Sequence, residues 1–117
     1  MKISDVKEIL KARILSGEDM IETEVCSACG SDLMSDVLAF VKDQALLLTG
    51  LINPQVIRTA EMMDIKAIVF VRGKLPEDSI IELAEEKNMI LMTTDYPLYV
   101  ACGELYNGGL KGSNKGA

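Results

Sequence analysis

The second half of the chain repeats one pattern of apolar and polar positions three times. Each copy is a short apolar run that ends in small polar residues, and a helix start follows at once. The apolar runs cover residues 45–48, 67–71 and 89–92. Successive side chains of a strand point to opposite faces, so a strand that is apolar at every position is buried on both faces. The three runs therefore predict parallel strands inside a sheet.

Helices with one apolar face are expected between these strands. Apolar residues recur at helical spacing over 4–11, from 32 to about 42, and after each of the three strands. In the helix from 32, the stripe that we expect to face the core comprises Leu33, Met34, Val37, Leu38 and Val41. Asn53-Pro54 is a strong start signal, because a capping amide precedes a proline at the first helical position. Asp95 is expected to cap the last helix.

Two shorter strands are predicted ahead of the alternating part, at 13–15 and 22–28. The order of elements is then helix, two strands, and an alternation of helix and strand that ends in a helix. This order predicts a single three-layer α/β domain over residues 1–106, with helices on both faces of a mainly parallel sheet of about five strands. Residues 107–117 carry no apolar period, and we expect a disordered tail there.

The charge balance narrows the range of partners. The 12 basic and 18 acidic residues give a net charge of -6, which argues against nucleic acid, whose affinity depends on basic residues. No apolar stretch approaches the roughly 20 residues that span a bilayer. The N-terminus lacks the apolar segment of a signal peptide. We therefore expect a cytoplasmic protein with no membrane partner.

Histidine is absent from the chain, and this absence excludes several kinds of chemistry. Ser-His-Asp catalysis, imidazole general bases and the common zinc sites all lose a required member. The glycines do not form a phosphate-binding P-loop sequence. We expect no catalytic residues, no metal and no cofactor.

The small polar residues after the strands are the candidate site, because ligands of such sheets bind outside the carboxyl ends of the strands. At the first strand end, Thr49 and Gly50 lead to Asn53, where free amides at a helix start could hold a phosphate or carboxylate. Arg58 follows about one helical turn later and could reach the same anion. The alternative is structural, since any strand-to-helix turn uses a glycine and a cap.

The other two strand ends add charged and hydroxyl groups. Arg72 and Gly73 follow the second run, and Arg72 could fork onto a carboxylate or phosphate. Thr93, Thr94 and Asp95 follow the third run. Solvated charges and a helix cap are the structural alternatives for these residues. A single carboxylate without histidine is a poor general-base site.

Cys26 and Cys29 have the spacing of a thiol redox pair. In thioredoxin-like sites such a pair opens a helix, whose dipole lowers the thiol pKa. Here the next helix starts only after Ser31, and strand alternation separates the two side chains. Two small buried thiols are the favoured interpretation, and a redox role stays open.

Taken together, these loops resemble the DRTGG domain family, which is similar to the N-terminal domain of HPr kinase/phosphorylase and occurs beside CBS domains in regulated pyrophosphatases. The likeness covers roughly residues 13 to 106 and begins at Ile14-Leu15-Ser16-Gly17. The family's Gly-Asp-Arg segment falls on Gly50-Leu51-Ile52, so only the glycine matches. The later Thr-Gly-Gly falls on Val71-Arg72-Gly73, and the final loop resembles Thr93 with Asp95-Tyr96.

This resemblance implies a small regulatory domain, usually dimeric, with no catalysis of its own. Our hypothesis is a homodimeric module that binds a small anionic ligand, a nucleotide or a phosphorylated metabolite, at the strand ends. The alternative is a protein-protein interaction module that docks on a partner enzyme, and a thiol redox protein is a third interpretation. The candidate ligand-binding residues are Thr49, Gly50, Asn53, Arg58, Arg72, Gly73, Thr93, Thr94 and Asp95.

Overall fold

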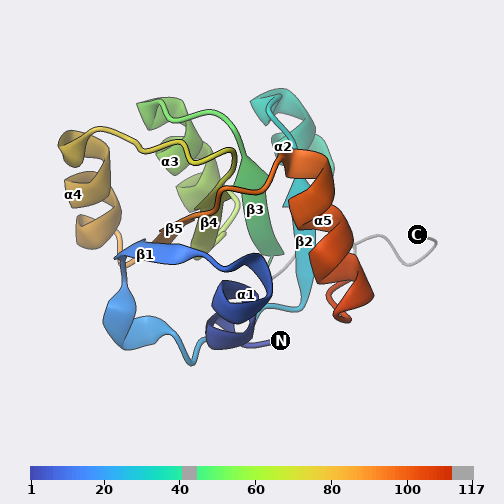
Figure 1. Ribbon diagram of the computed structural model, residues 1–117. Helices are drawn as coiled ribbons and strands as arrows, with labels where there is room; N and C mark the ends of the chain where they lie inside the picture. The colour runs from blue at the N-terminus through green and yellow to red at the C-terminus, as the bar shows by residue number, and fades with distance from the viewer. Residues whose placement is uncertain (41–44, 112–117) are drawn as a thin grey trace.

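Five strands and five α-helices form three layers in the computed structural model, which describes residues 1–40 and 45–111 (Figure 1). In chain order the elements are α1 (Ile3–Leu10), β1 (Arg13–Ser16), the 3-10 turn η1 (Glu18–Met20), β2 (Ser27–Gly30), α2 (Met34–Phe40), β3 (Ala45–Thr49), α3 (Pro54–Met62), β4 (Ala67–Phe70), α4 (Asp78–Glu86), β5 (Ile90–Thr93) and α5 (Leu98–Asn107). The three apolar runs are β3, β4 and β5, and the predicted α/β fold is confirmed.

The sheet has the strand order β1-β5-β4-β3-β2 and is mixed. β2, β3, β4 and β5 are parallel, while β1 pairs antiparallel with β5. In this antiparallel pair Arg13, the first residue of β1, lies opposite Thr93, the last residue of β5. The start of β1 therefore lies at the same edge of the sheet as the carboxyl ends of the parallel strands.

The helices divide between the two faces for a topological reason. From β2 to β5 the chain steps across the sheet in one direction, and right-handed crossovers then put α2, α3 and α4 on the same face. α5 and α1 cover the opposite face (Figure 1). The loop that leaves β4 thus runs to one face, and the loop that leaves its neighbour β5 runs to the other.

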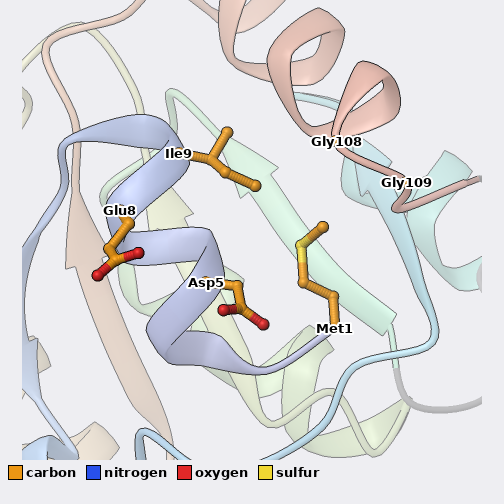
Figure 2. Close-up of a pocket in the computed structure, with 6 residues that line it drawn as sticks. All are labelled: Met1, Asp5, Glu8, Ile9, Gly108 and Gly109. Carbon is orange, nitrogen blue, oxygen red and sulfur yellow. The ribbon is translucent and has the colours of Figure 1, made fainter.

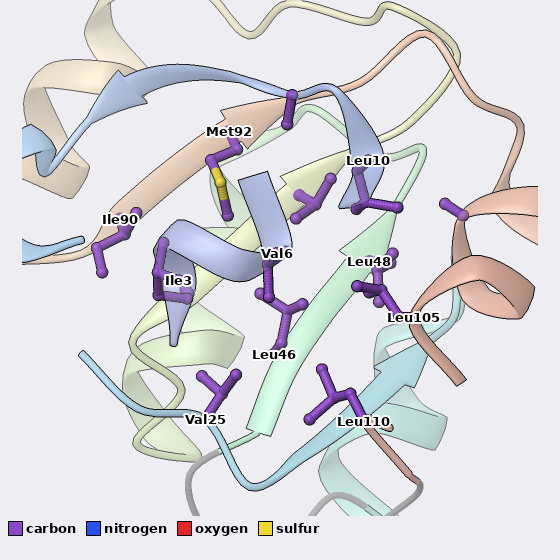
Figure 3. Packing of buried hydrophobic residues seen from close by; sticks show 14 of the residues in the cluster. Ile3, Val6, Leu10, Val25, Leu46, Leu48, Ile90, Met92, Leu105 and Leu110 are labelled. Carbon is purple, nitrogen blue, oxygen red and sulfur yellow. The ribbon is translucent and has the colours of Figure 1, made fainter. Parts of the chain in front are cut away.

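Alternate residues of the central strands feed two separate cores, as the apolar runs predict. Leu46, Leu48 and Val69 pack with α1 and α5, and Figure 3 shows this cluster around Val6 and Leu105. The intervening strand residues pack with α2, α3 and α4 on the other face: Ala45, Leu47, Ile68, Phe70 and Leu91. Burial on both faces makes the strands a rigid base for the loops at their ends.

Two element boundaries differ from the sequence prediction. The second strand begins at Ser27 rather than at 22, and ahead of it Glu24 makes an isolated bridge to Lys2. α2 begins at Met34, and Leu33 and Leu38 are exposed rather than facing the core. Val41, from the same predicted stripe, lies outside the described residues. A stripe of apolar residues does not distinguish a core face from a surface face.

The two ends of α5 also differ from the prediction. Its N-cap is Pro97, so Asp95 does not cap this helix. After α5 the chain packs on, since Leu110 is only 3% exposed and the amide of Ala28 donates to the carbonyl of Lys111. Packed structure thus continues past Tyr106, the predicted boundary, to Lys111, and residues 112–117 lie outside the described part of the chain.

Within residues 1–40 and 45–111, no helix has the length and apolar character needed to cross a bilayer.

Candidate functional site

The carboxyl edge of the sheet gathers five chain segments. They are the loops that leave β2, β3, β4 and β5, together with the short connection from α1 into β1. Because the β4 and β5 loops run to opposite faces, a crevice can open between them, and this is where sheets of this class bind ligands. Lys11 and Arg13 reach this edge only because β1 is antiparallel to β5.

At the β3 end, a carboxylate of the chain itself, that of Asp32, occupies the turn. The Oδ1 atom of Asp32 accepts hydrogen bonds from the Gly50 amide at 2.6 Å and from the Thr49 hydroxyl at 3.0 Å. The Thr49 hydroxyl oxygen in turn accepts from the amide of Leu51 at 3.1 Å. The Gly50 amide, in the turn that leads to the predicted helix start, is therefore occupied by a carboxylate from the segment ahead of α2.

Beside this turn lies a hollow of about 400 Å³ that opens between the start of α3 and the loop leading to α4. We call it the larger hollow, because it is the larger of the two hollows at this edge of the sheet. Its lining residues are Gly50, Leu51, Ile52, Asn53, Pro54, Lys74, Glu77, Ser79 and Ile80. Asn53 is the N-cap of α3, and its side chain makes no capping hydrogen bond within the described residues. Lys74 brings a positive charge and Glu77 a negative one.

The β4 and β5 loops are joined by three hydrogen bonds. The amides of Arg72 and Gly73 donate to the carbonyls of Tyr96 and Thr94, at 2.9 and 2.7 Å. The Thr93 hydroxyl donates to the carbonyl of Lys74 at 2.8 Å. Gly73 has a φ of 67°, in the left-handed region that glycine adopts without steric cost. These bonds hold the two loops in one arrangement.

Thr94 fixes α1 to the same edge. Its hydroxyl is buried and donates to the carbonyl of Leu10 at 2.7 Å, across 84 positions of sequence. Leu10 is the last residue of α1, and Lys11 follows it in the left-handed conformation, with a φ of 51°. This hydrogen bond therefore positions the backbone that carries Lys11 and leads into Arg13.

A second hollow, of about 210 Å³, lies at the point where these segments meet. We call it the switch-point hollow, because it lies where the loops that leave β4 and β5 diverge to opposite faces of the sheet. Its lining residues are Lys11, Arg13, Gly73, Thr93 and Asp95. A Cβ atom built on Gly73 would lie 3.0 Å from Oδ1 of Asp95, so the carboxylate approaches the loop closely. The hollow combines two cations with one carboxylate.

The structure divides the predicted site residues into three groups. Gly50 and Asn53 line the larger hollow. Gly73, Thr93 and Asp95 line the switch-point hollow. The other predicted residues are outside the linings of these two hollows in the described chain: Thr49 and Thr94, whose buried hydroxyls are used in internal hydrogen bonds, and Arg58 and Arg72, which are exposed.

The predicted site residues did not include Asp32 or the three cations that line the two hollows, Lys11, Arg13 and Lys74. Lys74 directly follows the predicted Gly73, and its position in a strand-end loop was a usable signal. Lys11 and Arg13 flank the start of the first strand, and only the antiparallel orientation of β1 brings them to the site. A sequence pattern does not specify that orientation.

A third hollow, of about 400 Å³, lies away from these loops, between α1 and the turn that follows α5 (Figure 2). Asp5 and Glu8 contribute the carboxylates of its lining, and Met1, whose terminal ammonium pairs with Glu24, also lines it. The Ile9 side chain projects from α1 toward Gly108. The two carboxylates make this hollow unsuited to an anion.

The cysteines differ from activated thiols. Burial raises the pKa of Cys29, and the nearby charge of Asp36 adds to this effect. Burial likewise raises the pKa of Cys102. A redox or nucleophilic cysteine requires a shift in the opposite direction, toward the thiolate. The prediction of two buried thiols is wrong for Cys26, which is exposed, and Cys29 is half-buried.

Among the described residues, no cluster of three or more histidine, cysteine, aspartate or glutamate side chains could hold a metal ion.

The model of the DRTGG domain family matches residues 5–105 of the sequence. The match covers most of the chain, and the protein therefore belongs to the DRTGG domain family. The predicted resemblance is confirmed, and the match begins at residue 5, ahead of the expected start near residue 13.

A solved structure resembles the fold. It is the CBS and DRTGG regulatory region of Clostridium perfringens pyrophosphatase complexed with its activator, diadenosine tetraphosphate, with a TM-score of 0.71 and 15% sequence identity. The match covers 89% of the present chain and 45% of that chain, so the present chain spans less than half of its neighbour. A search of curated protein sequences finds no match.

Proposed function

We propose that this DRTGG domain is a non-catalytic regulatory module that binds a small anionic ligand, a nucleotide or a phosphorylated metabolite, at the carboxyl edge of its sheet. The bound ligand would set the state of a partner enzyme. The structural neighbour supports this proposal by analogy, since it is a regulatory region described with a nucleotide activator. Because the two sequences are only 15% identical, the ligand class of the present chain is inferred from its own residues.

One observation supports the proposal above the others. Lys11, Arg13 and Lys74 line the hollows of the carboxyl edge and take part in none of the ion pairs formed within the described residues. The chain as a whole has a net charge of -6. Cations that form no ion pair within the described residues, gathered at the edge where such sheets bind ligands, favour an anionic ligand. Arg58 and Arg72 are exposed and could contact only a part of the ligand that projects from the hollows.

The proposal is tested by thermal unfolding of the full chain with a panel of nucleotides and phosphorylated metabolites, followed by calorimetry on each compound that stabilises it. A ligand present at 100 times its dissociation constant stabilises the folded state by about 2.7 kcal/mol. The triple variant Lys11→Gln, Arg13→Gln, Lys74→Gln should lose this stabilisation. A control that removes the same charge elsewhere, Lys7→Gln with Lys66→Gln and Lys87→Gln, should keep it. A panel without any stabilising compound would contradict the proposal, as would binding that the edge variant retains in full.

The interaction module is the second candidate, because large apolar side chains are exposed around α2 and α5. Tyr99 is 89% exposed and Leu33 is 58% exposed, with Leu38, Val100 and Tyr106 also exposed nearby in sequence. Monomeric proteins rarely leave large apolar patches uncovered. If this function holds, the full chain should retain a partner enzyme in a pull-down, and Tyr99→Ser should weaken that retention. A full chain that retains no partner enzyme would contradict this second candidate.

A further inference from the structure

We infer that the switch-point hollow holds the phosphoryl group of the ligand, and that its ligand class is a small phosphate monoester with a hydroxyl or amino group close to the phosphate. The inference rests on the proposed function, because it assigns a position and a class to the same anionic ligand. It assigns the anion to Lys11 and Arg13 rather than to the start of α3.

The first argument is topological. The loops leaving β4 and β5 run to opposite faces of the sheet, so their divergence defines the switch point of this fold. Gly73, from the first of these loops, and Asp95, from the second, line the hollow. The larger hollow lies between the β3 and β4 loops, which both run to the same face.

The second argument concerns the walls, which are fixed by buried or partly buried hydrogen bonds. Thr94 holds the end of α1 at 2.7 Å, and Thr93 holds the β4 loop at 2.8 Å. The Gly73 amide adds a bond of 2.7 Å to the Thr94 carbonyl. The backbone that carries each lining residue is thus in place before a ligand arrives, which lowers the entropic cost of binding.

The third argument compares charges at the two hollows. In the switch-point hollow two cations face one carboxylate, whereas in the larger hollow Lys74 is opposed by Glu77. The Gly50 amide beside the larger hollow is already occupied by Asp32. An arginine and a lysine together match a phosphoryl group, since the guanidinium can bond two oxygens and the ammonium a third.

Asp95 narrows the ligand class. Its carboxylate lines the same hollow and would repel a bare phosphate dianion. A ligand that offers a hydroxyl or amino group beside its phosphate converts this repulsion into a hydrogen bond, because a carboxylate accepts from such donors. The volume of about 210 Å³ is below the roughly 300–1,000 Å³ of sites for drug-sized ligands. It suits a phosphoryl group on a short stem.

Calorimetry on the full chain tests the inference with two probes at constant ionic strength. Glycerol phosphate carries a hydroxyl near its phosphate, and methyl phosphate does not. We expect glycerol phosphate to bind more tightly. Arg13→Gln and Lys11→Gln should each weaken its binding about tenfold, the cost of one charge-assisted hydrogen bond. Lys7→Gln, which removes one charge from the outer surface of α1, should change it less than about twofold.

Asp95→Ala gives the more discriminating measurement. It should abolish the preference for glycerol phosphate, because the acceptor for the ligand hydroxyl is gone, and it should bind methyl phosphate more tightly than the unmodified protein does, because the repulsive charge is gone too. Equal affinity for both probes in the unmodified protein would overturn the ligand class. Binding that Lys74→Gln weakens and Arg13→Gln does not would overturn the position, while the proposed function would stand. Absence of binding by either probe would overturn the inference, and absence across the wider nucleotide and metabolite panel would overturn the proposed function as well.

Discussion

The loops at the β3 end and at the β5 end of the same sheet edge differ in whether their polar groups already have a charged partner within the chain. At the β3 end, the Asp32 carboxylate accepts from the Gly50 amide and the Thr49 hydroxyl, so the position for an anion is filled from within the chain. At the β5 end, Lys11 and Arg13 line a hollow and take part in none of the ion pairs of the described chain. In the first arrangement, hydrogen-bond donors of the turn are paired within the chain. In the second, the positive charges are available to a ligand.

The comparison teaches that a strand-end turn with a glycine and a helix start is not sufficient to define an anion site. What matters is whether the donors of that turn already have a partner. The predictions below test this difference, and they run from the largest expected effect to the smallest.

Replacement of Thr94 by valine should give the largest loss of stability. Valine keeps the shape but removes the donor to the buried Leu10 carbonyl, and an orphaned buried acceptor costs about 1–3 kcal/mol. Urea denaturation measures the free energy of unfolding. Thr59→Val is a matched control, because the buried Thr59 hydroxyl has no hydrogen-bond partner among the described residues. We expect the control to be neutral or stabilising, and equal losses from both variants would contradict the role of Thr94.

Replacement of Asp32 by alanine should cost about 1–2 kcal/mol, since it removes a charged acceptor from two donors at a partly exposed position. Asp32→Asn should cost less, because its amide oxygen can still accept. Asp36→Ala, a nearby exposed aspartate on α2, should change the unfolding free energy by less than about 0.5 kcal/mol.

The same Asp32→Ala variant tests whether the Asp32 carboxylate is what keeps anions from binding at the β3 end. With its carboxylate gone, the Gly50 amide becomes a donor without a partner, and phosphate should begin to bind there. Amide chemical shifts of Gly50 in a phosphate titration measure this gain. If the unmodified protein already shows the shift, Asp32 does not keep anions away from this turn.

Replacement of Gly73 by alanine should cost about 1 kcal/mol, because its φ of 67° is unfavourable for a residue with a Cβ. The new Cβ would also crowd Asp95, at 3.0 Å from its Oδ1. Gly103→Ala is a control of opposite sign, since Gly103 lies within α5 with open space around its Cβ. Alanine should stabilise α5 by about 0.5–1 kcal/mol. Thermal unfolding separates the two, and a stabilising Gly73→Ala would show that the loop is not held as described.

The cysteines should give the smallest effect. Because burial raises the pKa of Cys29 and of Cys102, less thiolate is present at neutral pH than in the unfolded chain. Alkylation by iodoacetamide, followed by mass spectrometry, should therefore be slower in the native protein than in urea, and should accelerate as the pH rises. Rates at Cys29 or Cys102 that are higher in the native protein than in urea would contradict this account and indicate an activated thiol.

The fold was predictable from the sequence because its signal is local and repeated. Every position of an apolar run such as the one in β3 is apolar, and this predicts burial on both faces of the strand. Asn53-Pro54 marks the start of α3. The boundary of α2 was harder, because Leu33 and Leu38 are apolar yet exposed, and composition does not report on which side of a helix the core lies.

The site was only partly predictable, because its charges come from distant segments. Gly73, Thr93 and Asp95 follow strands whose ends the sequence locates, and they line one hollow as strand-end residues can. Lys11 and Arg13 join them through the antiparallel β1–β5 pairing and the bond from Thr94 to Leu10. Asp32 fills the β3 turn through a contact across 18 positions to Gly50. Such contacts exist only in the folded chain.

The central claim is that an anion binds between Lys11 and Arg13, at the β5 end of the edge. Titration of the 15N-labelled full chain with glycerol phosphate, followed by amide chemical shifts, tests it most directly. The account predicts saturable shifts with one common dissociation constant at Lys11, Arg13, Gly73 and Asp95. It predicts unchanged amides at Gly50 and at Gln55, the second residue of α3. Saturable shifts at Gly50 and Gln55 with unchanged amides at Lys11 and Arg13 would contradict it.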